Sequence, residues 1–123
     1  MPRLPSLFPI LASLLVGASA LHAQAGSHTV EGRVRRPAGA QGDSTGMGPL
    51  SGAWVTLHRV GKDTAGPIDS MRTDTQGRYR FRWTPSGATD AVYFASTTWG
   101  GIAYFTPPLR KVDTRADDAE LTV

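Results

Sequence analysis

The sequence contains no cysteine and no asparagine among its 123 residues. Without cysteine, the chain cannot form disulfide bridges, zinc-thiolate sites, iron–sulfur clusters or a thiol nucleophile. Without asparagine it cannot be N-glycosylated. It also lacks any apolar run of the roughly 18 residues that a membrane-spanning helix needs. The length, with 40% hydrophobic residues, indicates one compact domain.

Residues 1–25 have the layout of a secretory signal peptide. Arg3 and the amino terminus are positively charged, residues 7–16 form an apolar stretch, and small residues follow it. Residues 23–25 (Ala-Gln-Ala) fit the small-x-small rule of signal peptidase, and residues 18–20 are a second candidate. We therefore expect export by the Sec route to the periplasm or the medium, with a mature chain that starts at Gly26.

Lysine is scarce, with only Lys62 and Lys111 against eleven arginines. This bias is typical of a GC-rich bacterial codon pool. Once Arg3 is removed, 12 basic side chains stand against 10 acidic ones. So small an excess does not indicate nucleic acid as the ligand of an exported protein.

The region after residue 25 predicts an all-β domain. Short runs of alternating residues recur between Gly, Pro and Asp, which is typical of a β-sandwich or barrel, and no helical periodicity is present. Seven strands are expected, at 28–35, 53–60, 68–73, 78–83, 91–98, 102–106 and 119–123.

The run 78–83 (RYRFRW) alternates completely. Its aromatic side chains are predicted to face the core and its arginines to face water, since a slip by one residue would bury three charges. These two sets are Tyr79, Phe81 and Trp83, and Arg78, Arg80 and Arg82.

Turn residues divide the runs. Asp74 and Gly77 occupy the first and fourth positions of a type I turn, which predicts a hairpin from 68–73 into 78–83. Gly100-Gly101 predicts a second hairpin, between 91–98 and 102–106. The polar run 68–73 is expected to be an edge strand, and residues 38–52 are expected to be a long flexible connection.

Two groups of residues resemble a known family. Gly48-x-Leu50-x-Gly52-Ala53-x-Val55-x-Leu57, followed by Thr73-Asp74-x-x-Gly77-x-Tyr79-x-Phe81, is similar to the carboxypeptidase regulatory-like domain. The resemblance covers about residues 28–95. It implies a seven-stranded Greek-key sandwich of the transthyretin (prealbumin) type over residues 26–123. It also implies a non-catalytic accessory module of the kind found in peptidases, transporters and cell-envelope proteins.

One motif points toward catalysis. Gly42-Asp43-Ser44-Thr45-Gly46 matches the G-x-S-x-G pattern of serine hydrolases, in which a strand-to-helix turn presents the serine. Here no helix follows, and the mature chain has only His28 and His58 as bases. We expect no catalysis, and a small hydrolase that uses Ser44 or a histidine is the less favoured alternative. No metal or other cofactor is expected, because neither histidine has a partner at ligand spacing.

Two surface features are candidates for binding. If the strands at 28–35 and 78–83 share a sheet, their outward arginines form a basic patch that would attract an anionic polysaccharide or an acidic envelope protein. This patch comprises Arg33, Arg35, Arg78, Arg80 and Arg82. A solvated face enriched in arginine by codon usage is the simpler interpretation.

The second feature is a pair of aromatic residues, Trp99 and Tyr104, near the Gly100-Gly101 turn. They are candidates for stacking on sugar rings, and capping the open end of the sandwich is the alternative role. The sequence thus predicts an exported, non-catalytic binding or structural module of the bacterial envelope with a protein or polysaccharide partner. A carbohydrate-binding module that uses surface aromatics is the first alternative.

Overall fold

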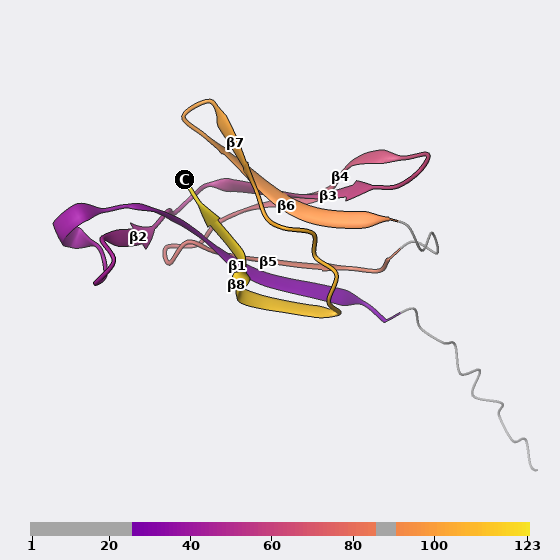
Figure 1. The fold of residues 1–123 in the computed structure, drawn as a ribbon, viewed down its shortest axis with the longest axis horizontal. Helices are drawn as coiled ribbons and strands as arrows, with labels where there is room; N and C mark the ends of the chain where they lie inside the picture. Colours follow the sequence, from indigo (N-terminus) through magenta and orange to yellow (C-terminus); the bar gives the residue numbers. More distant parts are fainter. Residues whose placement is uncertain (1–25, 86–90) are drawn as a thin grey trace, which may run out of the picture.

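The computed structural model describes residues 26–85 and 91–123, and the regular structure in this part is almost entirely β (Figure 1). The expected signal peptide, residues 1–25, lies outside the described residues. The strands are β1 (His28–Pro37), β2 (Met47–Pro49), β3 (Trp54–Val60), β4 (Ala65–Arg72), β5 (Arg78–Trp83), β6 (Val92–Trp99), β7 (Ile102–Phe105) and β8 (Asp113–Thr122). A 3-10 turn, Gly39–Gln41, is the one helical element of the described part. Within the described residues, no helix could span a membrane.

The strands form two layers (Figure 1). In the first, which we call sheet A, β1 pairs antiparallel with β2 and β5 and parallel with β8. In the second, sheet B, the order is β4-β3-β6-β7 and all pairs are antiparallel. The predicted all-β sandwich is confirmed, and β4 is an edge strand as expected.

The core lies between the two sheets. Sheet A contributes the three rings of β5, of which Tyr79 and Phe81 are 2% exposed and Trp83 is 7% exposed. Sheet B contributes fully buried Val55 and Leu57 from β3. The predicted orientation of β5 is therefore confirmed, and its arginines face away from the core.

Gly32 is required where three strands of sheet A pack closely. The Tyr79 ring passes over Gly32, and its hydroxyl donates a 2.5 Å hydrogen bond to the carbonyl of Ala119 on β8. A Cβ on residue 32 would lie 2.3 Å from that carbonyl oxygen and 2.4 Å from the tyrosine hydroxyl. The β1–β8 register shifts between Glu31 and Arg33, at the same place. Burial also raises the pKa of Tyr79, so this hydroxyl stays a donor.

The expected count of seven strands is wrong, because residues 26–85 and 91–123 form eight. The region 38–52, expected to be a flexible connection, contains the 3-10 turn and β2. Its backbone is bonded at both ends, by Ala38 N–H to the Gly46 carbonyl and Leu50 N–H to the Val34 carbonyl. A three-residue strand is too short to show alternation. The last strand also begins earlier than the expected 119, because its polar first half is held by parallel pairing to β1.

The turn at 74–77 forms as predicted. Gly77 N–H donates to the Asp74 carbonyl, and Asp74 Oδ1 accepts the backbone N–H groups of Gln76 and Arg78. The expected hairpin is nevertheless wrong, because β4 pairs with β3 and β5 pairs with β1. The turn carries the chain from sheet B to sheet A. The residues of the turn determine that the chain changes direction here. Which strand each segment then pairs with depends on how its apolar side is buried. The second hairpin, at Gly100-Gly101, is confirmed.

Candidate binding surfaces

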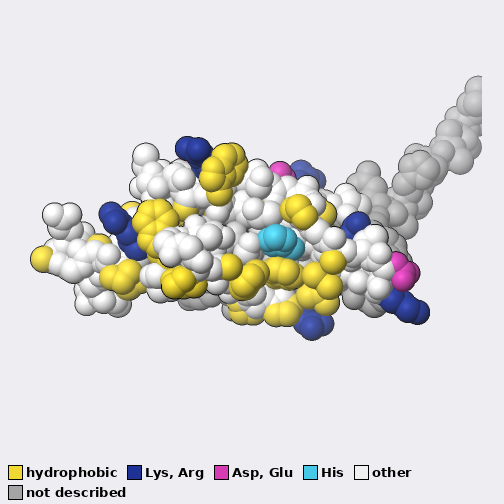
Figure 2. Space-filling view, turned by 90° about the horizontal axis from the view of Figure 1, so that it is seen from above, with side chains coloured by type: hydrophobic (Ala, Val, Ile, Leu, Met, Phe, Trp, Pro, Cys, Tyr) yellow, Lys and Arg dark blue, Asp and Glu magenta, His cyan; other side chains and the backbone are white. Residues whose placement is uncertain are grey.

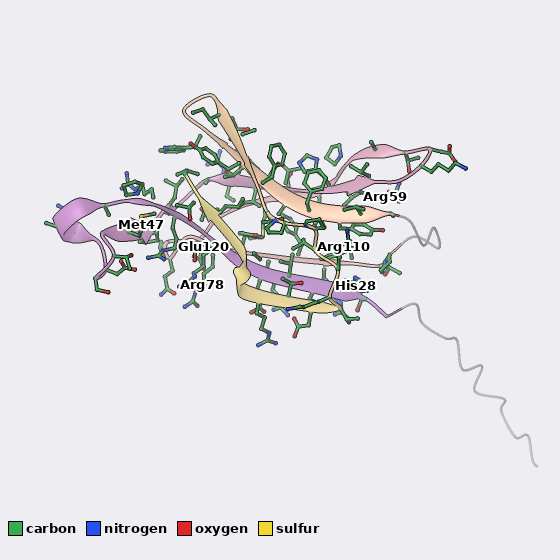
Figure 3. The ribbon with its side chains drawn as sticks, viewed as in Figure 1. His28, Met47, Arg59, Arg78, Arg110 and Glu120 are labelled. Atoms are coloured by element: carbon green, nitrogen blue, oxygen red, sulfur yellow. The ribbon has the colours of Figure 1, made fainter. Side chains whose placement is uncertain are left out.

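The predicted arginines lie together on the outer face of sheet A, which we call the arginine face. Pairing of β1 with β5 places Arg33 opposite Arg78, Glu31 opposite Arg80 and Thr29 opposite Arg82. Arg35 continues the same face of β1. Arg78 and Glu120 of this region are labelled in Figure 3.

Carboxylates accompany most of these arginines. Glu120 on β8 lies 3.6 Å from Arg33 and 3.5 Å from Arg35, and Glu31 lies 3.4 Å from Arg80. Arg35 also pairs with Asp43. Arg82 contacts the Ser27 hydroxyl, whereas the Arg78 guanidinium has no ion pair with any side chain that the structure describes.

An open hollow of about 590 Å³ lies on the arginine face. Its charged lining has both signs, with Glu31 and Asp74 beside the guanidinium groups. The arginine face is therefore a mixed network of charges rather than a continuous cationic surface. Ion pairs exposed in this way contribute little to stability.

The Gly42–Gly46 motif forms an ordered loop around Asp43. Its carboxylate accepts the Thr45 hydroxyl at 2.5 Å, the Thr45 N–H at 2.8 Å and the Met47 N–H at 3.2 Å. These bonds, led by the Thr45 hydroxyl, lower the pKa of Asp43 to about 2, with a smaller contribution from Arg35. Asp43 thus holds the loop, and Ser44 between these partners is exposed.

The described histidines are occupied elsewhere. His28 packs edge-on against Trp83, with ring centroids 5.6 Å apart, at the opposite end of β1 from this loop. The two ends of this ten-residue strand are about 30 Å apart at about 3.3 Å per residue. His58 lies on sheet B. The described part of the chain thus offers Ser44 no histidine base, and it contains no group of three His, Asp or Glu side chains that could hold a metal.

The outer face of sheet B carries a feature that the sequence analysis did not identify. Aromatic side chains from three adjacent strands lie on that face: Trp54 and His58 from β3, Phe94 from β6 and Phe105 from β7. We call these four side chains the aromatic face. Figure 2, which views this side, shows hydrophobic side chains around a histidine, with most lysines and arginines toward the rim.

The rings contact one another in two ways. His58 stacks on Phe94 with centroids 5.0 Å apart and planes 17° apart, and Phe94 meets Phe105 edge-on at 5.7 Å. Trp54 is held by Arg72, whose guanidinium carbon lies 4.9 Å from the ring centroid. Even so, Trp54 is 55% exposed and Phe105 is 59% exposed. Large rings left exposed on one face of a sheet make that face a candidate interaction site.

The predicted sugar-stacking residues lie elsewhere. Tyr104 is opposite buried Thr97 and packs against the core. Trp99 is 45% exposed near the tip of the β6–β7 hairpin. Tyr104 precedes Phe105 and Trp99 follows Thr98. Because side chains alternate along a strand, Tyr104 and Trp99 both point to the side of sheet B opposite to the aromatic face. The stacking role of these two residues stays a prediction.

The aromatic face was missed because its residues are separated in sequence. Each lies at a half-exposed position of a short strand, and only the β3–β6–β7 pairing brings them together. One signal was present, since 54–60 carries Trp54 and His58 on the face opposite to Val55 and Leu57. A strand with large rings on its outward side is evidence of a covered or binding face.

Comparison with known proteins gives no family. No family model matches the sequence, and no curated protein matches it. Among solved structures, the shaft pilin SpaA from Lactobacillus rhamnosus GG is similar over 79% of this chain and 47% of its own, with 16% identity and a TM-score of 0.48. This chain thus spans about half of that pilin's length. The major plantain pollen allergen Pla l 1 is similar over 79% of this chain and 94% of its own, with 16% identity and a TM-score of 0.45.

Proposed function

We propose that this protein is an exported, non-catalytic binding module of the bacterial cell envelope, of the carboxypeptidase regulatory-like type. The observation that carries the proposal is the aromatic face, where Trp54 and Phe105 are each more than half exposed on an outer sheet surface. Large apolar rings left in water in a small domain are explained by a partner that covers them.

Two further observations support the proposal. The residues of the family resemblance have structural roles, since Leu50, Ala53 and Tyr79 are buried and Gly77 completes a turn. The signal-like pattern at 1–25 supports export. On the arginine face, by contrast, the guanidinium groups are largely paired within the molecule, which favours the aromatic face as the binding surface.

The test uses the full chain expressed in a bacterial host. We expect the exported protein to begin at Gly26, as measured by intact mass. It should then co-sediment with envelope fragments of the source cells. The double variant Trp54→Ala/Phe105→Ala should bind at least about tenfold more weakly, because truncating a ring at the centre of an interface commonly removes more than about 1 kcal/mol.

Arg80→Ala is the matched control, because it changes an exposed side chain on the other sheet and should leave binding unchanged. Equal co-sedimentation of the double variant and the wild type would refute the proposal. So would a wild-type protein that stays in the supernatant, or one retained in the cytoplasm.

A further inference from the structure

We infer that the aromatic face binds a neutral polysaccharide, laid diagonally across sheet B from Trp54 to Phe105. This inference rests on the proposed function, since it names the partner of the same surface. Its starting point is the pairing register, which fixes the neighbours of every outward side chain on β4, β3, β6 and β7.

The outward residues form rows across the sheet. In one row Arg72 pairs with Trp54 and Thr98 with Ala103, and extending the register by one residue from the Val55–Thr97 pair places Trp54 beside Thr98. The next row reads Ser70, Thr56, Ser96, Phe105. A third row contains His58 and Phe94. Trp54 and Phe105 are therefore two strands and one row apart, which is roughly 12 Å at a strand spacing of about 4.8 Å and a rise of about 3.3 Å per residue.

Hydroxyl groups occupy the space between the two rings. Thr98 and Ser96 lie on the intervening strand β6, and Thr56 lies beside Ser96 on β3. The Ser96 hydroxyl is oriented by His58, whose Nε2 lies 2.7 Å from it. An exposed ring, a strip of hydroxyls and a second exposed ring thus follow one another along a diagonal.

This sequence of groups suits a chain of pyranose units. Sugar rings have apolar C–H faces that stack on aromatic rings, and hydroxyl edges that exchange hydrogen bonds with serine and threonine. A single sugar does not span both rings, whereas an oligosaccharide reaches them together, and the second contact then gains from the first.

Charge complementarity argues for a neutral occupant. Among the outward residues of these rows Arg72 is the one charged side chain, and it is already engaged with the Trp54 ring. A second copy of this face would cover the Thr56, Ser96 and Thr98 hydroxyls with aromatic rings, which offer them poor partners.

The His58–Phe94 pair supports this arrangement. Phe94 stacks on His58 and presents its edge to Phe105, so Phe105 rests on a fixed neighbour rather than on water. Rings held in place before binding lose less conformational freedom when a ligand stacks on them.

The inference is tested by calorimetric titration of the exported protein with cellohexaose, chitohexaose, maltohexaose and mannohexaose. We expect saturable binding of at least one probe. Trp54→Ala and Phe105→Ala should each weaken it about tenfold, while Ile102→Ala, which truncates an exposed side chain of β7 off the diagonal, should leave it unchanged. Failure of all four probes would overturn the inference, and so would binding that survives Trp54→Ala/Phe105→Ala or is lost in Ile102→Ala.

A second measurement separates this inference from the proposed function. Envelope fragments digested with protease should retain the wild-type protein, and fragments digested with glycosidases should release it. Loss of binding after protease alone would show a protein partner, which overturns the polysaccharide and leaves the binding module intact. Self-association in sedimentation velocity that disappears in Trp54→Ala, without glycan binding, would likewise identify a second copy as the occupant.

Discussion

At the scale of single residues, Asp43 shows how a motif typical of one chemistry serves another purpose. The glycines and serine of the 42–46 segment match a hydrolase pattern, but the carboxylate between them organises the segment by accepting hydrogen bonds from Thr45 and Met47. Its pairing with Arg35 ties the loop to β1. The role of the loop is therefore structural, since Asp43 holds it in shape and attaches it to β1 at one end of sheet A.

The lowered pKa of Asp43 predicts a pH dependence. The carboxylate stabilises the fold when ionised, so its contribution is complete above the ordinary value of 3.8 and is lost as the pH falls through about 2. Asp43→Asn should remove this part of the profile, so that its melting temperature changes less between pH 4 and pH 2 than that of the wild type. Scanning calorimetry in that window measures the effect, and parallel wild-type and variant profiles would contradict it.

At the scale of elements, the β1–β5 pair contains an unfavourable match. Arg33 and Arg78 lie directly opposite each other, and like charges at such positions are destabilising. Glu120 on β8 relieves Arg33, while Arg78 has no carboxylate partner in the described part of the chain. The strand pair is held instead by the inward rings of β5, which is why the arginines are tolerated.

Arg78→Glu should therefore stabilise the protein. The variant places a carboxylate opposite Arg33, and a cross-strand pair of opposite charges contributes about 0.2–1 kcal/mol. Urea unfolding at low salt should show this gain, and added salt should reduce it because the pair is exposed. Arg82→Glu is the control, since residue 82 lies opposite Thr29 and should gain little. An unchanged or lower unfolding free energy for Arg78→Glu would contradict the argument.

At the scale of the whole molecule, stability depends on the contact between the two sheets. Disulfides are absent, so the apolar core must hold a domain whose sheets are joined by connections such as the 74–77 turn. Leu57 from sheet B and the rings of Tyr79 and Phe81 from sheet A belong to one buried cluster. Loss of volume in that cluster weakens both layers together.

Leu57→Ala is expected to lower the free energy of unfolding by about 2–5 kcal/mol, because Leu57 is fully buried and the substitution leaves a cavity. Ile68→Ala on the edge strand β4 is the comparison, since Ile68 is 40% exposed and its change should stay within about 0.5 kcal/mol. Urea denaturation followed by tryptophan fluorescence measures both. Similar losses for the two variants would show that the sheets are not held by this cluster.

The fold class and the inward direction of the β5 rings follow from the residue pattern alone. Alternation has a period of two along a strand, so the burial of Tyr79, Phe81 and Trp83 could be deduced without knowing their neighbours. Turn residues such as Asp74 and Gly77 act over four positions and were equally readable. Both patterns involve residues that are close together in the chain, so they can be recognised in a single sequence.

Strand pairing, in contrast, depends on how the two sheets pack against each other. It placed β4 and β5 in different sheets although a tight turn joins them, and it set carboxylates such as Glu120 beside the arginines. It also brought Trp54, Phe94 and Phe105 onto one surface. These pairings and contacts join residues that are separated in the chain. They depend on how the two sheets bury their apolar sides, and no pattern among neighbouring residues predicts that.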